Sequence, residues 1–322
     1  MVDISIWITT YNHEKYIAEA IESVLRQETT FTYELVIGED CSTDRTREIV
    51  LAYKAQYPDK IKLLLPDKNL GMIPMYKATY SLCTGKYVAW LDGDDYWTDP
   101  FKLQKQVGFL ADNPDYVLCF HNVEVLDQLK NITYAAGGPT YKYPDDTLSY
   151  EHFLQPNHIN PISAPSVVYR NVLGPYLPDW YFDLPYPDLG LYFLMLEHGK
   201  FKYLNEIMCV YRIHKGGAWS GETLYNNVQQ IATFCKILIQ HTNNPNNERI
   251  HKIIGDYSYA LLEWDLKSYK YRAATTHLKD VVTHDIGLLK SHLPKLLYLT
   301  GISFIKSPKQ ILKKMRPKQK KV

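Results

Sequence analysis

The chain has 322 residues, of which 46% are hydrophobic and 22% are charged. This balance is typical of a globular protein with a sizeable core, and it excludes a disordered chain. The formal net charge is +1, yet residues 306–322 contain eight basic side chains and no acidic one. The preceding residues therefore carry 28 basic side chains (36 less 8) against 35 acidic ones, which disfavours nucleic-acid binding by the body of the protein.

The first 120 residues alternate β-branched runs with amphipathic patterns. Such alternation is typical of a doubly wound α/β sheet. The runs predict strands at 4–9, 33–37, 61–65, 87–91 and 117–125, and helices at 14–27, 43–53, 73–82 and 101–110. The run at 87–91 is almost entirely apolar, as expected of a parallel strand buried on both faces.

The remainder of the chain predicts a different organisation. Residues 130–185 are rich in Pro, Tyr, Asn and Gly, and we interpret them as irregular with a short element at 166–169. A helix is expected at 189–198 and strands at 201–203 and 207–211, followed by helices at 222–241, 248–266 and 270–282. We therefore expect an α/β domain over 1–220, a helical region over 221–285 and a tail over 286–322.

Cysteine usage and hydropathy indicate the compartment. Five cysteines are dispersed without a C-x-x-C spacing, which favours reduced thiols in a cytosolic protein over a disulfide framework or a zinc site. A strand-like run follows almost directly after Met1, so no signal peptide is expected, and no apolar stretch is long enough to predict a membrane span. These patterns predict a cytoplasmic protein.

The end of the 87–91 run is the most informative part of the sequence. It continues into Asp92, Gly93, Asp94 and Asp95, which place three carboxylates within four positions. These carboxylates repel one another unless a cation lies among them, and Mg²⁺ or Mn²⁺ would take such oxygen ligands and share them with substrate phosphates. The simpler interpretation is an acidic turn that is solvated at the end of a strand.

Two other polar loops are expected at the same edge of the sheet. Thr9-Thr10-Tyr11-Asn12 follows the first predicted strand, and the second is followed by the loop 38–44, which contains Glu39, Asp40 and Asp44. Ligands of open α/β sheets bind beyond the carboxyl ends of the strands. Each loop alone could be an ordinary polar turn or a helix cap, but together they predict a nucleotide pocket. G-x-G-x-x-G after the first strand and G-x-x-x-x-G-K-[ST] are both absent, which disfavours a dinucleotide-binding or P-loop enzyme.

These motifs, in this order and spacing, resemble a family 2 glycosyltransferase of the GT-A fold. The resemblance covers residues 3–219, and it rests on 6–12, 20–27, 39–44, 69–71, 85–95 and Tyr211-Arg212-Ile213-His214. It implies a mixed α/β sheet flanked by helices, a nucleoside-diphosphate sugar donor, a divalent metal (Mn²⁺ or Mg²⁺) and inversion at the anomeric carbon. A UDP-sugar is the favoured donor.

The resemblance also implies roles for particular residues. Asp94 is expected to bind the metal directly, and Asp92 to contact ribose, the metal or metal-bound water. His214 is expected at the metal or the diphosphate. The residues expected to bind the nucleotide sugar are Thr9, Tyr11, Glu39, Asp40, Lys68, Asp92 and Arg212. Lys77 is a second candidate for the diphosphate, although a lone lysine is commonly a solvated surface residue.

An inverting transfer needs a general base to deprotonate the acceptor hydroxyl. The family has an acidic residue at the start of a helix before its tyrosine-arginine-x-histidine element, and Asp188 fits that position. Asp183 is the second candidate, and the alternative is an ordinary helix N-terminal aspartate. The chain departs from the family pattern at Glu39 and Cys41, where aspartate and glycine are common.

The C-terminal end combines an apolar stripe with a basic cluster. Residues 286–297 place Ile and Leu at helical spacing ahead of the basic tail, which is typical of an anchor on an anionic membrane surface. A terminal helix packed on the body, with a solvated tail, is an equal alternative.

We expect a transferase that acts on a glycan or lipid-linked acceptor in bacterial surface polysaccharide synthesis, in the cytoplasm or peripherally on the cytoplasmic face of the inner membrane. The competing classes are a sugar-phosphate nucleotidylyltransferase and a non-catalytic carbohydrate-binding or scaffold protein.

Overall fold

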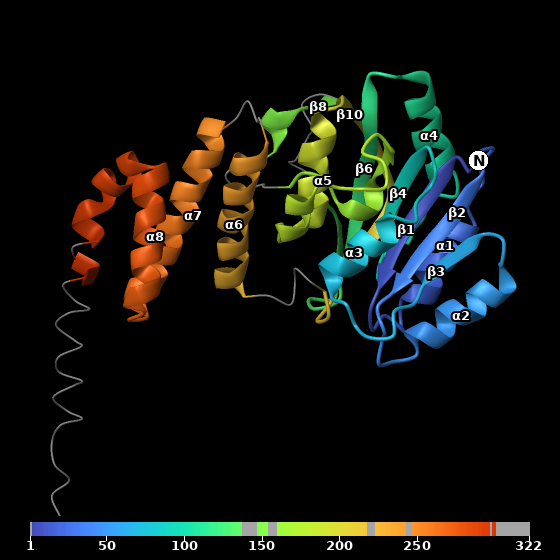
Figure 1. Ribbon diagram of the computed structural model, residues 1–322, viewed down its shortest axis with the longest axis horizontal. Helices are drawn as coiled ribbons and strands as arrows, with labels where there is room; N and C mark the ends of the chain where they lie inside the picture. Colours follow the sequence, from blue (N-terminus) through green and yellow to red (C-terminus); the bar gives the residue numbers. More distant parts are fainter. Residues whose placement is uncertain are drawn as a thin grey trace, which may run out of the picture. The chain divides into compact units, whose positions relative to one another are not determined.

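The computed structural model describes residues 2–136, 147–153, 160–217, 223–242, 247–296 and 298–300. The chain divides into two compact units, Met1–Gly221 and Glu222–Val322. The first unit is built around one mixed sheet, and the second is helical within its described residues (Figure 1).

Within the described residues the sheet has ten strands, and its main path runs β3-β2-β1-β4-β9-β6-β10-β5. The strands are β1 (Ile4–Thr10), β2 (Tyr33–Glu39), β3 (Ile61–Leu64), β4 (Tyr87–Asp92), β5 (Tyr96–Trp97), β6 (Tyr116–Asp127), β7 (Ile132–Ala135), β8 (Thr147–Leu148), β9 (Val168–Arg170) and β10 (Lys200–Ile213). Strands β3, β2, β1 and β4 are parallel to one another, whereas β9 runs antiparallel to both β4 and β6. This reversal makes the sheet mixed.

Helices cover both faces of the sheet in the first unit. They are α1 (Ile17–Leu25), α2 (Thr46–Gln56), α3 (Met72–Tyr80), α4 (Lys102–Asp112) and α5 (Pro187–Leu196), with short 3₁₀ helices η1 (Tyr150–His152), η2 (Ala164–Ser166) and η3 (Asp179–Asp183). Alternate β1 residues face opposite sides, because successive strand side chains alternate. Ile6 packs into a core shared with α1, α2 and α4, while the Trp7 ring contacts Tyr76 edge-on and Tyr80 at a tilt, both on α3.

The register of the sheet determines which loops meet. Thr9 pairs with Asp92 across β1 and β4, and Thr10 pairs with Glu39 across β1 and β2. The loops that follow β1, β2 and β4 therefore begin at neighbouring positions on one edge of the sheet, as the sequence predicts.

The expected α/β fold is confirmed, with several corrections in detail. The helix predicted from residue 14 begins at Ile17, because residues 13–16 form a turn in which the His13 carbonyl accepts the N–H groups of Tyr16 and Ile17. The two strands predicted at 201–203 and 207–211 are the single strand β10, whose register against β6 shifts between Leu204 and Ile207. Strands β5, β7 and β8 are absent from the sequence prediction, and β9 overlaps the short element expected at 166–169, which was not identified as a strand.

The second unit contains α6 (Leu224–His241), α7 (Asn247–Lys267) and α8 (Tyr271–His284), followed by a helical run over 286–296. From the C-terminal apolar stripe, Leu296 is buried in the core of this unit and Leu289 packs partly against it, whereas Ile286 and Leu293 are exposed. The basic residues 306–322 lie outside the described residues. Among the helices that the structure describes, none combines the length and apolar character needed to cross a membrane.

Candidate functional site

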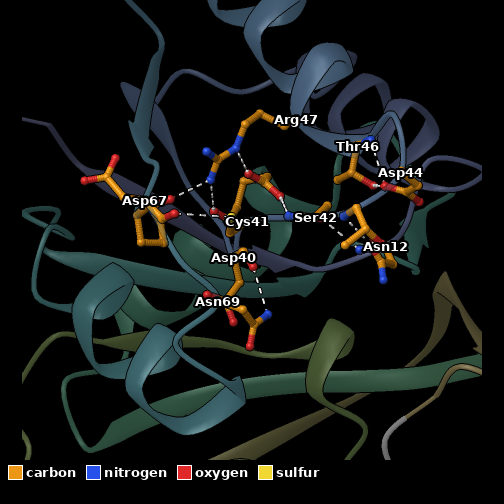
Figure 2. Close-up of polar contacts among 12 residues, drawn as sticks. Asn12, Asp40, Cys41, Ser42, Asp44, Thr46, Arg47, Asp67 and Asn69 are labelled. Atoms are coloured by element: carbon orange, nitrogen blue, oxygen red, sulfur yellow. Dashed lines mark hydrogen bonds and ion pairs between the residues drawn. The ribbon is translucent and has the colours of Figure 1, made fainter.

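The loops after β1 and β2 are joined by side-chain hydrogen bonds to backbone groups. The Asn12 N–H donates to Ser42 Oγ over 2.9 Å, and the Thr43 N–H donates to Asn12 Oδ1 over 2.8 Å (Figure 2). Asn12 and Cys41 both have a φ of 56°. This left-handed conformation favours glycine, so the glycine that the family resemblance implies at position 41 would fit this backbone.

Glu39 lies inside the β2 loop rather than at its surface. Its carboxylate is fully buried, accepts the Ser42 N–H over 2.6 Å and forms an ion pair with Arg47 Nε. Arg47 also donates to the carbonyl of Pro66 over 2.9 Å (Figure 2). The Glu39 carboxylate therefore helps to shape the loop, and its expected contact with the nucleotide stays a prediction.

Asp40 connects the same loop to the segment before α3. Its two carboxylate oxygens accept the N–H groups of Leu70, over 2.7 Å, and Gly71, over 2.9 Å. The Asn69 side chain donates to the Asp40 carbonyl over 2.9 Å (Figure 2). Asp40 therefore fixes residues 69–71 at the edge of the site. The other expected nucleotide contacts lie nearby, with Tyr11 41% exposed, Thr9 half-buried and Lys68 exposed.

Lys77, the alternative diphosphate ligand, is placed on α3. Its ammonium lies 3.4 Å from the Asp179 carboxylate and 4.4 Å from the ring centroid of Phe182. Both contacts are with residues of η3, so the Lys77 ammonium lies against that helix at the protein surface.

Gly93 allows the acidic loop to approach β1 closely. Its N–H donates to the Thr9 carbonyl over 3.0 Å, and a Cβ atom at this position would lie only 2.7 Å from Thr10 Cβ and Oγ1. Any side chain at Gly93 would therefore displace the two flanking aspartates, Asp92 and Asp94.

Asp92 is held by two donors from the buried aromatic cluster. Tyr76 OH donates to Asp92 Oδ1 over 3.0 Å, and Trp90 Nε1 donates to the same oxygen over 3.1 Å. Burial raises the pKa of Asp92 to about 7, and the charges of Asp94 and Asp188 add to the rise. Asp188 is thus near enough to Asp92 for its charge to contribute to this pKa.

Asp94 faces two imidazoles. His214 Nε2 lies 2.9 Å from Asp94 Oδ2, and His13 Nε2 lies 3.8 Å from the same oxygen. Burial alone would raise the pKa of Asp94, but the hydrogen bond with His214 and the charge of His13 together hold it below its ordinary value. One ligand atom from each of His13, Asp94 and His214 lies within 4.8 Å of the others.

An oxygen and two imidazole nitrogens at this spacing fit a divalent transition metal. The donor chemistry therefore supports the predicted metal role of Asp94 and His214. Asp92, at the end of β4 and two positions before Asp94, provides a second carboxylate near this cluster.

Arg212 supports the acidic loop from within the protein. Its guanidinium donates to the Asp94 carbonyl over 2.5 Å, forms an ion pair with Glu19 and lies between the rings of Tyr16 and Tyr96. Only 6% of Arg212 is exposed. These bonds show that Arg212 positions the acidic loop, and its expected contact with the nucleotide stays a prediction.

Asp95 completes the support of the acidic loop. One of its carboxylate oxygens accepts the Arg212 N–H over 2.8 Å, and its side chain is buried. Burial, together with the charges of Asp94 and Asp92, raises the pKa of Asp95 well above its ordinary value. Asp95 therefore holds β10 against the loop rather than contributing a third open carboxylate.

Asp188 lies in the first turn of α5, where it is half-buried. Asn160 Nδ2 donates to Asp188 Oδ2 over 2.8 Å. Burial raises the pKa of Asp188 to about 6, against the opposing effect of backbone N–H groups and Asn160. Asp183, the second candidate, is exposed at the end of η3.

Three residues of the site were not predicted from the sequence. His13, Tyr76 and Asn160 contact the acidic loop or the predicted base from distant parts of the chain. The sequence could have indicated His13 as a site residue, because it directly follows the predicted Thr9–Asn12 loop. A cavity of about 610 Å³ includes His13 and His214 in its lining, together with residues 11–12, 14–16, 128–129, 215–216 and Asp44.

Comparisons with known proteins agree with this geometry. The model of the family described as "Glycosyl transferase family 2" matches residues 5–173, which is more than half of the chain. An uncharacterised protein of Mycobacterium tuberculosis is 35% identical over 228 residues, which cover 67% of this chain and 60% of that protein. TuaG of Bacillus subtilis, named as a teichuronic acid biosynthesis glycosyltransferase, is 34% identical over 34% of this chain and 42% of its own length.

Solved structures show the same fold. TarS of S. aureus in complex with UDP-GlcNAc has a TM-score of 0.62 at 16% identity, over 93% of this chain and 88% of that chain. A mannosyltransferase of Pyrobaculum calidifontis in complex with GDP-Man and Mn²⁺ has a TM-score of 0.56 at 15% identity, over 93% and 83%.

The mixed sheet, its loop edge and these structural matches define the GT-A class of glycosyltransferase fold. Within that class, the chain belongs to glycosyl transferase family 2. The resemblance drawn from its motifs is confirmed. The chain spans about 60% of the length of the mycobacterial relative.

Proposed function

We propose that this protein is a metal-dependent inverting glycosyltransferase. It transfers a sugar from a nucleoside-diphosphate donor, with a UDP-sugar favoured, to a hydroxyl of a glycan or lipid-linked acceptor. The observation that carries the proposal is the convergence of Asp94, His214 and His13 at the loop edge, with Asp188 close enough to raise the pKa of Asp92. A metal-binding cluster and a general base facing one space are the two parts that this reaction needs.

Asp188 would remove the proton from the acceptor hydroxyl. As that oxygen bonds to the anomeric carbon, the bond from the carbon to the diphosphate oxygen breaks, and the nucleoside diphosphate leaves with the electron pair. The raised pKa of Asp188, at about 6, leaves the carboxylate ionised at neutral pH while making it a better proton acceptor than an ordinary aspartate. A divalent metal bound by Asp94 and His214 would supply electrostatic stabilisation of the leaving diphosphate.

The loops after β1 and β2 would hold the nucleotide. Tyr11 is exposed and offers its ring to the base, and Thr9 lies at the end of β1 beside Asp92. Asp40 would act by fixing residues 69–71, next to the exposed Lys68. The TarS complexes with UDP and UDP-GlcNAc support a uridine nucleotide, whereas the GDP-Man complex shows that the fold also takes another base.

The acceptor is proposed from relatives and from the tail. The match to TuaG supports an acceptor in surface polysaccharide synthesis. The basic residues 306–322 would bring the enzyme to an anionic membrane surface, where a lipid-linked acceptor would be available. The protein would then act on the cytoplasmic face of the membrane.

The proposal is tested by a thermal-shift panel of nucleoside diphosphates, with Mn²⁺ and with a chelator. A ligand at 100 times its Kd stabilises the folded state by about 2.7 kcal/mol, and we expect this stabilisation only when the metal is present. Release of the nucleoside diphosphate from the matching sugar nucleotide should then be lost in Asp94→Asn and Asp188→Asn but kept in the exposed control Asp183→Asn. Stabilisation by none of the nucleotides, or full turnover in Asp188→Asn, would contradict the proposal.

A further inference from the structure

The ring of His13 occupies a position that the protein itself does not explain. Its Nδ1 is buried and makes no hydrogen bond to the described residues, and its Nε2 lies 3.8 Å from Asp94 Oδ2, which is beyond hydrogen-bond length. The side chain is only 15% exposed. The gap between His13 Nε2 and Asp94 Oδ2 is too long for a hydrogen bond, yet it is short enough for one metal ion to lie between the two atoms.

The backbone of His13 is fixed independently of its ring. The His13 N–H donates to Thr46 Oγ1 over 2.8 Å, and its carbonyl accepts the N–H groups of Tyr16 and Ile17, each over 2.9 Å. These bonds define the turn that starts α1, and an alanine at position 13 would keep all of them. The hydrogen bonds of the turn therefore do not involve the ring, which contacts the turn only through an edge-on approach to the Tyr16 ring, and the turn holds the ring beside Asp94.

The distances around Asp94 Oδ2 match ligands that share one ion. At metal–ligand bonds of about 2.1 Å, two ligands at a right angle lie about 3 Å apart, and two opposite ligands lie about 4.2 Å apart. The separation from Asp94 Oδ2 is 2.9 Å for His214 Nε2 and 3.8 Å for His13 Nε2. Both values fall within this range, although only the first suits a hydrogen bond.

We propose that His13 is a third protein ligand of the metal, so that the ion is bound by two imidazole nitrogens and one carboxylate oxygen. This inference rests on the metal dependence in the proposed function. Imidazole suits transition metals, whereas Mg²⁺ prefers oxygen ligands and retains its water. The donor set that includes His13 therefore selects Mn²⁺ over Mg²⁺.

The test is pulsed electron paramagnetic resonance of Mn²⁺ bound to the full chain, which detects coupling to each ligating imidazole nitrogen. We expect two coupled imidazoles in the wild-type protein, one in His13→Ala and two in the control His198→Ala, whose residue is exposed at the end of α5. His13→Gln, which keeps a polar side chain of similar size, should also show one. In both His13 variants, Mn²⁺ affinity should fall at least about tenfold, while Mg²⁺ affinity changes much less.

The outcomes separate this inference from the proposed function. Unchanged nitrogen coupling and Mn²⁺ affinity in folded His13→Ala would overturn the role of His13 and leave metal dependence intact. Failure of the wild-type protein to bind Mn²⁺, even with a nucleoside diphosphate present, would overturn both.

Discussion

Replacement of Gly93 by alanine tests how closely the acidic loop must approach β1. The added Cβ would lie 2.7 Å from Thr10 Cβ and Oγ1 and 3.0 Å from the Thr9 carbonyl oxygen. Thr10 cannot move away easily, because it is buried and paired with Glu39 of β2. Overpacking of this kind typically costs about 1–3 kcal/mol, so we expect the free energy of unfolding to fall by about 2 kcal/mol.

The substitution should also weaken metal binding, because relief of the clash moves Asp94 away from His214. Urea denaturation and Mn²⁺ titration measure the two effects separately. Gly108→Ala is the matched control, since a Cβ at this position in α4 meets no atom within 4 Å. It should leave Mn²⁺ affinity unchanged and raise stability by up to about 1 kcal/mol, because alanine is the better helix former. Wild-type stability and Mn²⁺ affinity in Gly93→Ala would refute the reasoning.

Four further predictions follow from the site. The rate of nucleoside diphosphate release should fall below pH 6, because Asp188, with a pKa of about 6, acts only when ionised. Asn160→Ala should move the midpoint of this pH–rate profile upward, because it removes a hydrogen-bond donor to the Asp188 carboxylate. An unmoved midpoint would assign the titration to another group. Arg212→Lys should lower the free energy of unfolding, measured by urea denaturation, by about 2 kcal/mol, because lysine cannot keep the bonds to both Glu19 and the Asp94 carbonyl. An unchanged free energy of unfolding would contradict the positioning role of Arg212. Cys41→Gly should raise thermal stability by up to about 1 kcal/mol by relieving the positive φ, whereas Cys41→Val should lower it. Removal of residues 301–322 should reduce co-sedimentation with anionic liposomes without lowering the melting temperature, and equal binding would exclude the anchor.

Much of the fold follows from local patterns in the sequence. The apolar run ending at Asp92 predicts a buried parallel strand, and the alternation around it predicts the helices that cover the sheet. Strand β9 could not be predicted in this way, because it has only three residues in a segment rich in Pro and Tyr. Its antiparallel pairing with both β4 and β6 is decided by tertiary contacts rather than by its own composition.

The candidate site was predictable where one motif carries the chemistry. Asp92, Asp94 and Asp188 lie where the motifs indicate. The sequence could not show that Glu39 is buried against Arg47, or that Arg212 donates to the Asp94 carbonyl, because both contacts depend on the tertiary fold. His13 was missed because its relation to Asp94 spans 81 positions (94 less 13) and depends on the turn before α1.

The central claim is that the acidic loop binds a metal that meets the diphosphate of a donor. The most direct measurement is a crystal structure with Mn²⁺ and UDP, with anomalous scattering recorded at the manganese edge. The account predicts one strong anomalous peak in contact with Asp94, His214 and the UDP phosphates. Clear density for UDP at the loop edge without a manganese peak beside Asp94 would contradict it.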